Sequence, residues 1–466
     1  MIINVTAWGL GADFLVSLGF SFYGSYGCPA NEFYFMMSKE DTLAAVSLWM
    51  EKYKRGEKNM NEYGLEYLKK KLAIKSNRVM MRYNYYEMKN GIRELSGIIP
   101  ADFCNLSEVL GWCAKAVDTL SDRLIVDGFE NDNFYINEIY KYNNPDVLFD
   151  SAIVSALISS CSFIFIGMED NYPKMQVIDG SNATGIIDQT TNLMTEGYAI
   201  LERDKYKKPL VEAYFTPNKT IYYRNGIASE ELNHTANSAL LVPIIYRPDA
   251  KRPFGHSRIS RACMNITQSA LRTLRRSEVA AEFYSFPQKY VLGLDADAEW
   301  NSKLATMSSF LSFGNDGKGN KPSVGQFQSS NLAPFSEHIK MFASLFAGET
   351  GLTLDDLGFV TSNPSSEGAI RAAHENLRLT ARKAQRTFGT GFLNAAYLSA
   401  CLRDNKHYDR KAFADSSVSW APIFEPDSST LGAIGDAIIK INQASEGFLG
   451  SNNIRKLTGL RSDANG

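Results

Sequence analysis

The sequence lacks the residue patterns that mark most enzymes and metal proteins. Its six cysteines, at positions 28, 104, 113, 161, 263 and 401, are too far apart for a zinc or redox motif. We expect them to be buried free thiols in a reducing compartment. The five histidines share no ligand spacing, and no dinucleotide fingerprint, nucleophile elbow or kinase set occurs. These absences argue against an enzyme, a metal site and a bound cofactor.

Three segments carry only a superficial likeness to a chemical site. Residues 314–321 are rich in glycine and lysine, but their spacing is not that of a phosphate-binding P-loop, and we expect a hairpin tip. Asp295, Asp297 and Glu299 alternate like metal ligands, although aspartate at a helix start usually serves as a cap. His256 lies beside an expected helix start, and we predict a structural role for it.

Positive charge is missing from the start of the chain, since no lysine or arginine precedes Lys39. A signal peptide needs a positive first segment, and Asp13 among many glycines interrupts any membrane span. Ser38 and the acids after it would cap an amphipathic helix. We therefore predict that translation begins at Met36 or Met37, or else that residues 1–36 form a poorly anchored arm outside the core.

Positive charge is instead concentrated near the middle of the chain. The whole sequence of 466 residues has 49 basic and 51 acidic residues, yet residues 251–276 hold seven lysines and arginines and no acid. Ile259, Cys263, Ile266, Ala270 and Leu274 recur there at helical spacing, and Gly255 to Ser257 would start the helix. An apolar stripe with a cationic flank is typical of a helix that packs against copies of itself near a polyanion. Alternatively, the arginines pair with acids of a neighbouring helix, at about 0.3–0.5 kcal/mol each.

The remaining pattern predicts an α+β fold that is predominantly α. Helices are expected at 41–55, 60–73, 78–89, 106–124 and 146–160, followed by a buried strand at 163–167 and short antiparallel strands between 175 and 246. After the basic helix at about 257–284, strands at 287–294 and 324–327 bracket a short helix at 297–313, and a helix at 337–346 follows. The longest helix is expected at 367–403, with a helical tail at 429–444 and 452–458.

Several of these segments, read in order, resemble the portal proteins of tailed bacteriophages, especially the siphophage type from Gram-positive hosts. The likeness rests on the aromatic helix end at 83–90, on 112–129, on 143–167, on Val242 and Pro243, and on 252–262 with 278–293. It continues through 352–369 and the long helix behind it, so that it spans about 42–425. Residues 1–36 have no counterpart in the family pattern.

The resemblance implies a division of the chain into portal regions. Residues 37–250 would form the wing, 251–284 the first stem helix, 285–333 the clip, 334–350 the second stem helix, 351–368 the tunnel loop, and 369–466 the long helix with the crown. It also implies a homo-oligomeric ring, usually of twelve subunits, at one capsid vertex of the virion, assembled in the host cytoplasm. Expected partners are double-stranded DNA in transit, the large terminase subunit, major capsid and scaffold proteins and a head–tail adaptor, with no membrane and no cofactor.

Two sets of site residues follow from this resemblance together with the charge pattern. A DNA conduit must not grip phosphates, and no lysine or arginine occurs between Lys340 and Arg371. We therefore expect the tunnel loop to line the channel with Asp355, Asp356, Thr361, Ser362, Asn363 and Ser365. The cationic helix face is expected to meet a neighbouring subunit through Arg261, Arg272, Arg275 and Arg276.

Two other classes of protein remain as alternatives. A minor capsid or head–tail connector component is the first, and it would lack a clip inserted between two helices and would form no closed ring alone. A nucleic-acid-processing enzyme such as a terminase subunit is the second, but it would need a P-loop and a carboxylate metal cluster.

Overall fold

The computed structural model describes residues 2–4, 34–36, 63–93, 108–285, 289–292, 323–326, 331–359, 372–424 and 428–458. The chain divides into two units, residues 1–63 and 64–466. In the first unit, β1 (Ile2–Asn4) pairs antiparallel with β2 (Tyr34–Met36). The expected helix at 41–55 and the predicted start at Met36 or Met37 concern mainly residues outside the described ranges, so both stay predictions.

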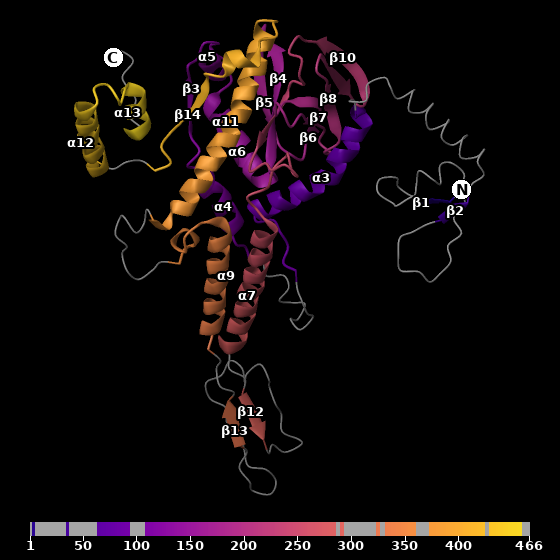
Figure 1. Cartoon of the computed structure of the whole chain (residues 1–466). Coiled ribbons are helices and arrows are strands. Elements are labelled where there is room, and N and C mark those ends of the chain that lie inside the picture. Colours follow the sequence, from indigo (N-terminus) through magenta and orange to yellow (C-terminus); the bar gives the residue numbers. More distant parts are fainter. Residues whose placement is uncertain are drawn as a thin grey trace. The chain divides into compact units, whose positions relative to one another are not determined.

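An antiparallel five-stranded sheet forms one layer of the second unit (Figure 1). Its strands lie in the order β10 (Ile227–Asn233), β9 (Lys219–Arg224), β8 (Pro209–Phe215), β7 (Met194–Arg203) and β6 (Ala183–Ile187). The strands expected between 175 and 246 did not include β10, because every residue of that strand is exposed and no apolar alternation marks it. Asn225 and Gly226 join it to β9 with positive φ at both positions, the conformation of a tight hairpin turn.

A second, three-stranded sheet carries the main core. It has the order β11 (Leu241–Ile245), β4 (Cys161–Glu169) and β5 (Tyr172–Ile178), and α6 (Pro145–Ser159) and α11 (Glu375–Arg403) pack against it. β4 is buried over most of its length because helices cover it, so its sequence is a continuous apolar run. Phe149 of α6 meets Phe392 of α11 edge to face, with ring centroids 4.8 Å apart.

Smaller elements complete this body. They are α4 (Trp112–Ser121), β3 (Val126–Glu130) paired with β14 (Ser417–Trp420), α5 (Ile136–Tyr142), η3 (Arg410–Phe413), α12 (Ser428–Ala444) and α13 (Ser451–Thr458). Neither α5 nor the β3–β14 pair was predicted from the sequence. β14 pairs with a strand almost 290 residues earlier in the chain, and local pattern carries no such information.

Three expected boundaries move in the structure. The helices predicted at 60–73 and 78–89 are one helix, α3 (Gly64–Tyr86), because its buried residues Leu68, Leu72 and Val79 stay on one face through the predicted gap. The helix predicted from 106 begins only at Trp112. The long helix begins at Glu375, since His374 adopts a turn conformation, and its 29 residues span about 43 Å.

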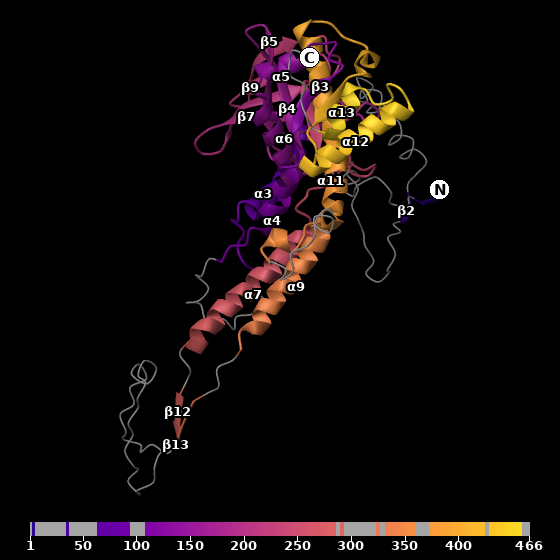
Figure 2. The same cartoon turned by 90° about the vertical axis from the view of Figure 1, so that its left-hand side faces the viewer.

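Two helices form an arm in which α7 (Arg261–Ser285) and α9 (Ala333–Thr350) lie side by side (Figures 1 and 2). Between them in the chain lies the antiparallel pair β12 (Lys289–Leu292) and β13 (Ser323–Gln326). The helix–strand–strand–helix order was expected from the sequence. The short helix predicted at 297–313 and the glycine-rich segment 314–321 lie outside the described residues.

The helix start proposed at Gly255 to Ser257 was wrong. α7 begins at Arg261, and Ser260 caps it, because its hydroxyl accepts the backbone N–H of Cys263 at 3.1 Å. The Ser257 hydroxyl instead donates to the carbonyl of Ile158 at 2.6 Å. Gly255, at φ +72°, makes a tight turn beneath β11 where any side chain would meet the Tyr246 carbonyl.

Candidate assembly surface and channel loop

The base of the arm is anchored in the body by a buried cation. Arg258 donates from Nε to the carbonyl of Ala116 at 3.2 Å and from Nη2 to the carbonyl of Thr350 at 2.5 Å. Thr350 is the last residue of α9, so the guanidinium also faces the negative end of that helix dipole. Arg258 therefore ties α4 to the C-terminus of α9. This role was not predicted from the sequence, because the segment holds seven basic residues and nothing local distinguishes Arg258 from the exposed ones.

The four arginines predicted for a subunit interface have different surroundings. Arg275 is buried and pairs with Glu108 of the same chain, with Nη2–Oε2 and Nε–Oε2 distances of 2.9 and 3.0 Å. Arg272 donates to the Ser269 hydroxyl at 2.9 Å. Arg261 and Arg276 are exposed. The pairing with an acid of a neighbouring segment, the alternative considered from the sequence, therefore holds for Arg275.

Within the arm, α7 buries Cys263, Met264, Ala270 and Leu271, whereas α9 leaves much of its apolar surface uncovered. Within α9 the buried side chains are Ala343, Phe346, Ala347 and Thr350, all in its C-terminal half. Leu345 is 53% exposed and Met341 is 46% exposed. A helix buries an apolar stripe against another element in a stable fold. The arm thus presents apolar and cationic side chains without a covering layer among the described residues of its own chain.

The loop after α9 is built around one aspartate. In η2 (Asp355–Leu357), Asp356 accepts the backbone N–H and the hydroxyl of Thr353, both at 2.9 Å, and its own N–H donates to the Thr353 hydroxyl at 3.2 Å. His374 Nδ1 lies 3.8 Å from the Asp356 carboxylate. Asp356 therefore closes a local turn, whereas Asp355 is exposed. Thr361, Ser362, Asn363 and Ser365 lie outside the described residues.

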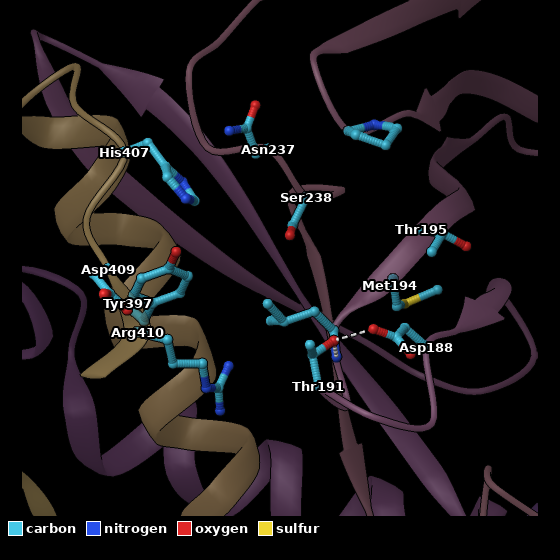
Figure 3. A pocket seen from close by; sticks show the side chains of 12 residues that line it. Asp188, Thr191, Met194, Thr195, Asn237, Ser238, Tyr397, His407, Asp409 and Arg410 are labelled. Carbon is cyan, nitrogen blue, oxygen red and sulfur yellow. Dashed lines mark hydrogen bonds between the residues drawn. The ribbon is translucent and has the colours of Figure 1, made fainter. Parts of the chain in front are cut away.

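One hollow of the body is a cleft lined largely by residues of turns (Figure 3). It has a volume of about 670 Å³ and opens between α11 and the β6–β7 turn. Asp188 accepts from the Thr190 N–H and the Thr191 hydroxyl, and Asp409 accepts the Lys411 N–H at the start of η3. Its carboxylates thus cap local turns.

The described residues contain no candidate metal site and no candidate membrane-spanning helix. Across the ranges that the structure describes, no group of three or more His, Cys, Asp or Glu is arranged to hold a metal ion. None of the helices in those ranges is both long and apolar enough to cross a bilayer. The candidate metal ligands Asp295, Asp297 and Glu299 lie outside the described residues. The four described cysteines are buried, and burial raises the pKa of Cys161 to about 11.

Two portal proteins of mycobacteriophages are similar to this chain along most of its length. No family model matches the chain. The portal protein of Mycobacterium phage L5 is 22% identical over 391 residues, which covers 78% of this chain and 79% of that protein. The portal protein of Mycobacterium phage D29 is 23% identical over 398 residues, 80% of each chain.

Solved structures give fainter matches over a similar span. A chain from the virion of a native gene transfer agent particle has a TM-score of 0.43 and 13% identity, covering 82% of this chain and 99% of that chain. A chain from the neck of the native particle, computed with C12 symmetry, has a TM-score of 0.44 and 14% identity over the same shares.

Proposed function

We infer that this chain is a portal protein of a tailed phage, distantly related to those of phages L5 and D29, and that it serves in the virion as a structural component. The observation that carries this inference is the identity of 22–23% along about four-fifths of both the chain and its relatives. A similarity spread over nearly the whole length favours a shared architecture over a shared module. The role is one of assembly and passage, and it needs no catalytic residue.

The finer proposal is a portal of the siphophage type from a Gram-positive host, organised as a closed ring of twelve subunits around a DNA channel. In this proposal the wing covers 37–250, α7 and α9 form the stem, the segment between them is the clip, and the crown follows α11. The arm supports it, because two helices that bracket a β hairpin occur where the family pattern expects stem and clip.

The outer faces of the arm are proposed as a subunit interface. Arg261, Arg272 and Arg276 present charge there, and Leu345 and Met341 present apolar surface. Arg275 is left out of this interface, since its guanidinium is held by Glu108. In a closed ring each arm would lie between two copies, which would bury these side chains.

The segment 351–368 is proposed as the tunnel loop. Its support is electrostatic: no lysine or arginine occurs from 341 to 370, whereas Asp355 and Asp356 are acidic. Each cation that bound a DNA phosphate would add salt-sensitive affinity and slow the passage of DNA. Deleting residues 358–365 should therefore leave rings intact but block DNA packaging in a phage complementation assay, and normal packaging would remove this assignment.

Partners follow from the same proposal. The ring would receive the large terminase subunit during packaging and a head–tail adaptor afterwards, and it would be held by the major capsid and scaffold proteins. Negative-stain microscopy with mass photometry of the purified chain tests the premise. Rings with an axial hole and a mass near twelve subunits are expected, whereas a compact dimer or tetramer without a hole would favour another virion component.

A further inference from the structure

A basic patch lies where helix α3 meets the start of α7 and the segment that leads into it. This α3 basic patch consists of six side chains: Lys71, Lys75, Arg78, Arg82, Arg252 and Arg261. The four on α3 follow one another at spacings of four, three and four, so they share one helix face. Burial, followed by repulsion from Lys75, lowers the pKa of Lys71 to about 8. Burial and three neighbouring arginines lower the pKa of Arg82 as well. The six cations therefore act on each other as one charge cluster.

Most partners of this patch in the described part of the subunit are neutral, and the exception is Asp249, whose carboxylate accepts the backbone N–H of Arg252 at 2.7 Å. Lys71 donates to the Gly185 carbonyl at 2.6 Å, and Lys71 and Lys75 lie 5.0 and 4.9 Å above the Phe254 ring. Arg82 donates to the Ser159 carbonyl at 3.1 Å, while its Nε is buried without a partner. Within the described ranges no carboxylate forms an ion pair with any of the six.

An acidic patch of similar character lies at the other end of α6. It consists of Asp122, just after α4, with Asp146 and Asp150 on the first two turns of α6, and all three are exposed. Partial burial raises the pKa of Asp150, and repulsion from Asp146 and Asp122 adds to this. No ion pair within the described residues neutralises these three carboxylates. Both patches therefore carry unrelieved repulsion between like charges.

The two members of the acidic patch on α6, Asp146 and Asp150, lie far from Arg82 within one subunit. Arg82 binds the carbonyl of Ser159, the last residue of α6, whereas Asp150 and Asp146 lie nine and thirteen residues earlier. At 1.5 Å per residue, these separations are about 13 and 20 Å along the helix. The screening length at physiological salt is about 8 Å. Attraction between the patches is thus largely screened inside one copy, while direct contact remains open between copies.

We propose that the α3 basic patch of one copy binds the acidic patch of Asp122, Asp146 and Asp150 on the next copy, as a heterologous contact that closes the ring. The proposal rests on the ring of the proposed function. A closed ring requires two different, complementary surfaces on every subunit, and the two patches are such a pair on one rigid helix scaffold. Complementary charges of this kind fix how two subunits align with each other, and they increase the rate at which the subunits associate.

A charge swap tests the contact. Variant A carries Lys75→Glu and Arg78→Glu, and variant B carries Asp146→Lys and Asp150→Lys; all four side chains are exposed. Each variant alone should require at least about a tenfold higher subunit concentration for ring formation, because two pairs become repulsive. An equimolar mixture of A and B should assemble again as alternating rings, since each altered patch then meets its complement. The combined variant in one chain should also assemble.

Controls separate this proposal from its alternatives. Lys70→Glu, which changes an exposed lysine beside the patch on α3, should assemble like the unaltered chain in mass photometry. If the unaltered chain forms no ring, the proposed function fails first. If rings of A form normally, or if A and B mixed remain as impaired as each alone, the patch contact is refuted. Loss of binding to a 30-base-pair duplex in A with intact rings would assign the patch to DNA instead, and would overturn the proposal.

Discussion

The body and the arm of this protein use buried surface in opposite ways. In the body, α6 and α11 cover the three-stranded sheet, and aromatic rings such as Phe149, Tyr140 and Phe392 pack within it. In the arm, α9 buries four side chains and leaves Leu345 and Met341 about half exposed. The rings buried in the body stabilise the subunit. The exposed side chains of α9 contribute little to that core, and they are the part of the arm that we propose for assembly.

Removing a ring from the body should have the largest effect. Phe392→Ala deletes a fully buried side chain between Phe149 and Trp420, and we expect a loss of about 3–5 kcal/mol in the free energy of unfolding. Leu345→Ala in the arm is the matched control and should change the stability of the monomer by less than about 0.5 kcal/mol. Urea unfolding of monomeric protein measures both. If both variants lose the same free energy of unfolding, the proposed difference between body and arm is wrong.

The junction between body and arm should show the next largest effect. Arg258→Met leaves the carbonyls of Ala116 and Thr350 without their donor, at a cost of about 3 kcal/mol. Arg258→Lys should recover only part of this, because one ammonium lacks the planar fork that reaches both carbonyls. Thermal unfolding reports the loss, with the exposed Lys251→Met as the control. An unchanged melting temperature for Arg258→Met would remove the anchoring role of Arg258.

Charge reversal on the arm should affect assembly more than folding. Arg272→Glu with Arg276→Glu should raise the concentration needed for ring formation about tenfold, because the neighbouring copy would meet inverted charge. Mass photometry measures ring formation, and circular dichroism confirms that the variant is folded. Intact rings at the concentrations used for the unaltered chain would refute the interface role of this face.

The last prediction concerns a pH dependence at the edge of the body. The pKa of Lys71 is lowered to about 8 in the folded chain, mainly by burial, against about 10.4 for an unfolded lysine. Between these values the unfolded state binds the proton that the folded state has lost, so this group makes the protein more stable as the pH rises. Lys71→Met removes this titration. The variant should therefore have a higher free energy of unfolding than the unaltered chain at pH 7, and this difference should shrink between pH 8 and 10.5. If the urea midpoints of the variant and of the unaltered chain change in parallel across that pH range, the lowered pKa of Lys71 is contradicted.

Local pattern was sufficient where burial follows a regular period. The apolar stripe that includes Cys263 and Ala270 predicted α7, and the continuous run at 163–167 predicted β4, because each element buries one face or both. The same logic failed for β10, which buries nothing, and for the β3–β14 pair, whose partners are remote in the chain. The Asn225–Gly226 turn was the one local signal from which β10 could have been found.

Local pattern could not assign roles to the basic residues. Arg258, Arg261 and Arg275 belong to one cationic stretch, yet Arg258 is enclosed by α4 and α9, Arg275 is held by Glu108, and Arg261 is exposed. The partners of Arg258 and Arg275 belong to segments that lie from 90 to more than 160 residues away in the chain. The tunnel-loop residues from Thr361 to Ser365 stay predictions.

The sequence by itself determined the α+β class, most helices and strands, and the order of two helices around a hairpin, since periodic burial and turn residues are local properties. Only the tertiary structure decided which charges are neutralised by partners within the subunit and which remain unpaired on its surface. The reason is that a charge is neutralised by whatever lies within a few ångströms of it, and folding rather than chain order sets those neighbours. The two unneutralised patches at opposite ends of α6 became visible only in the folded chain.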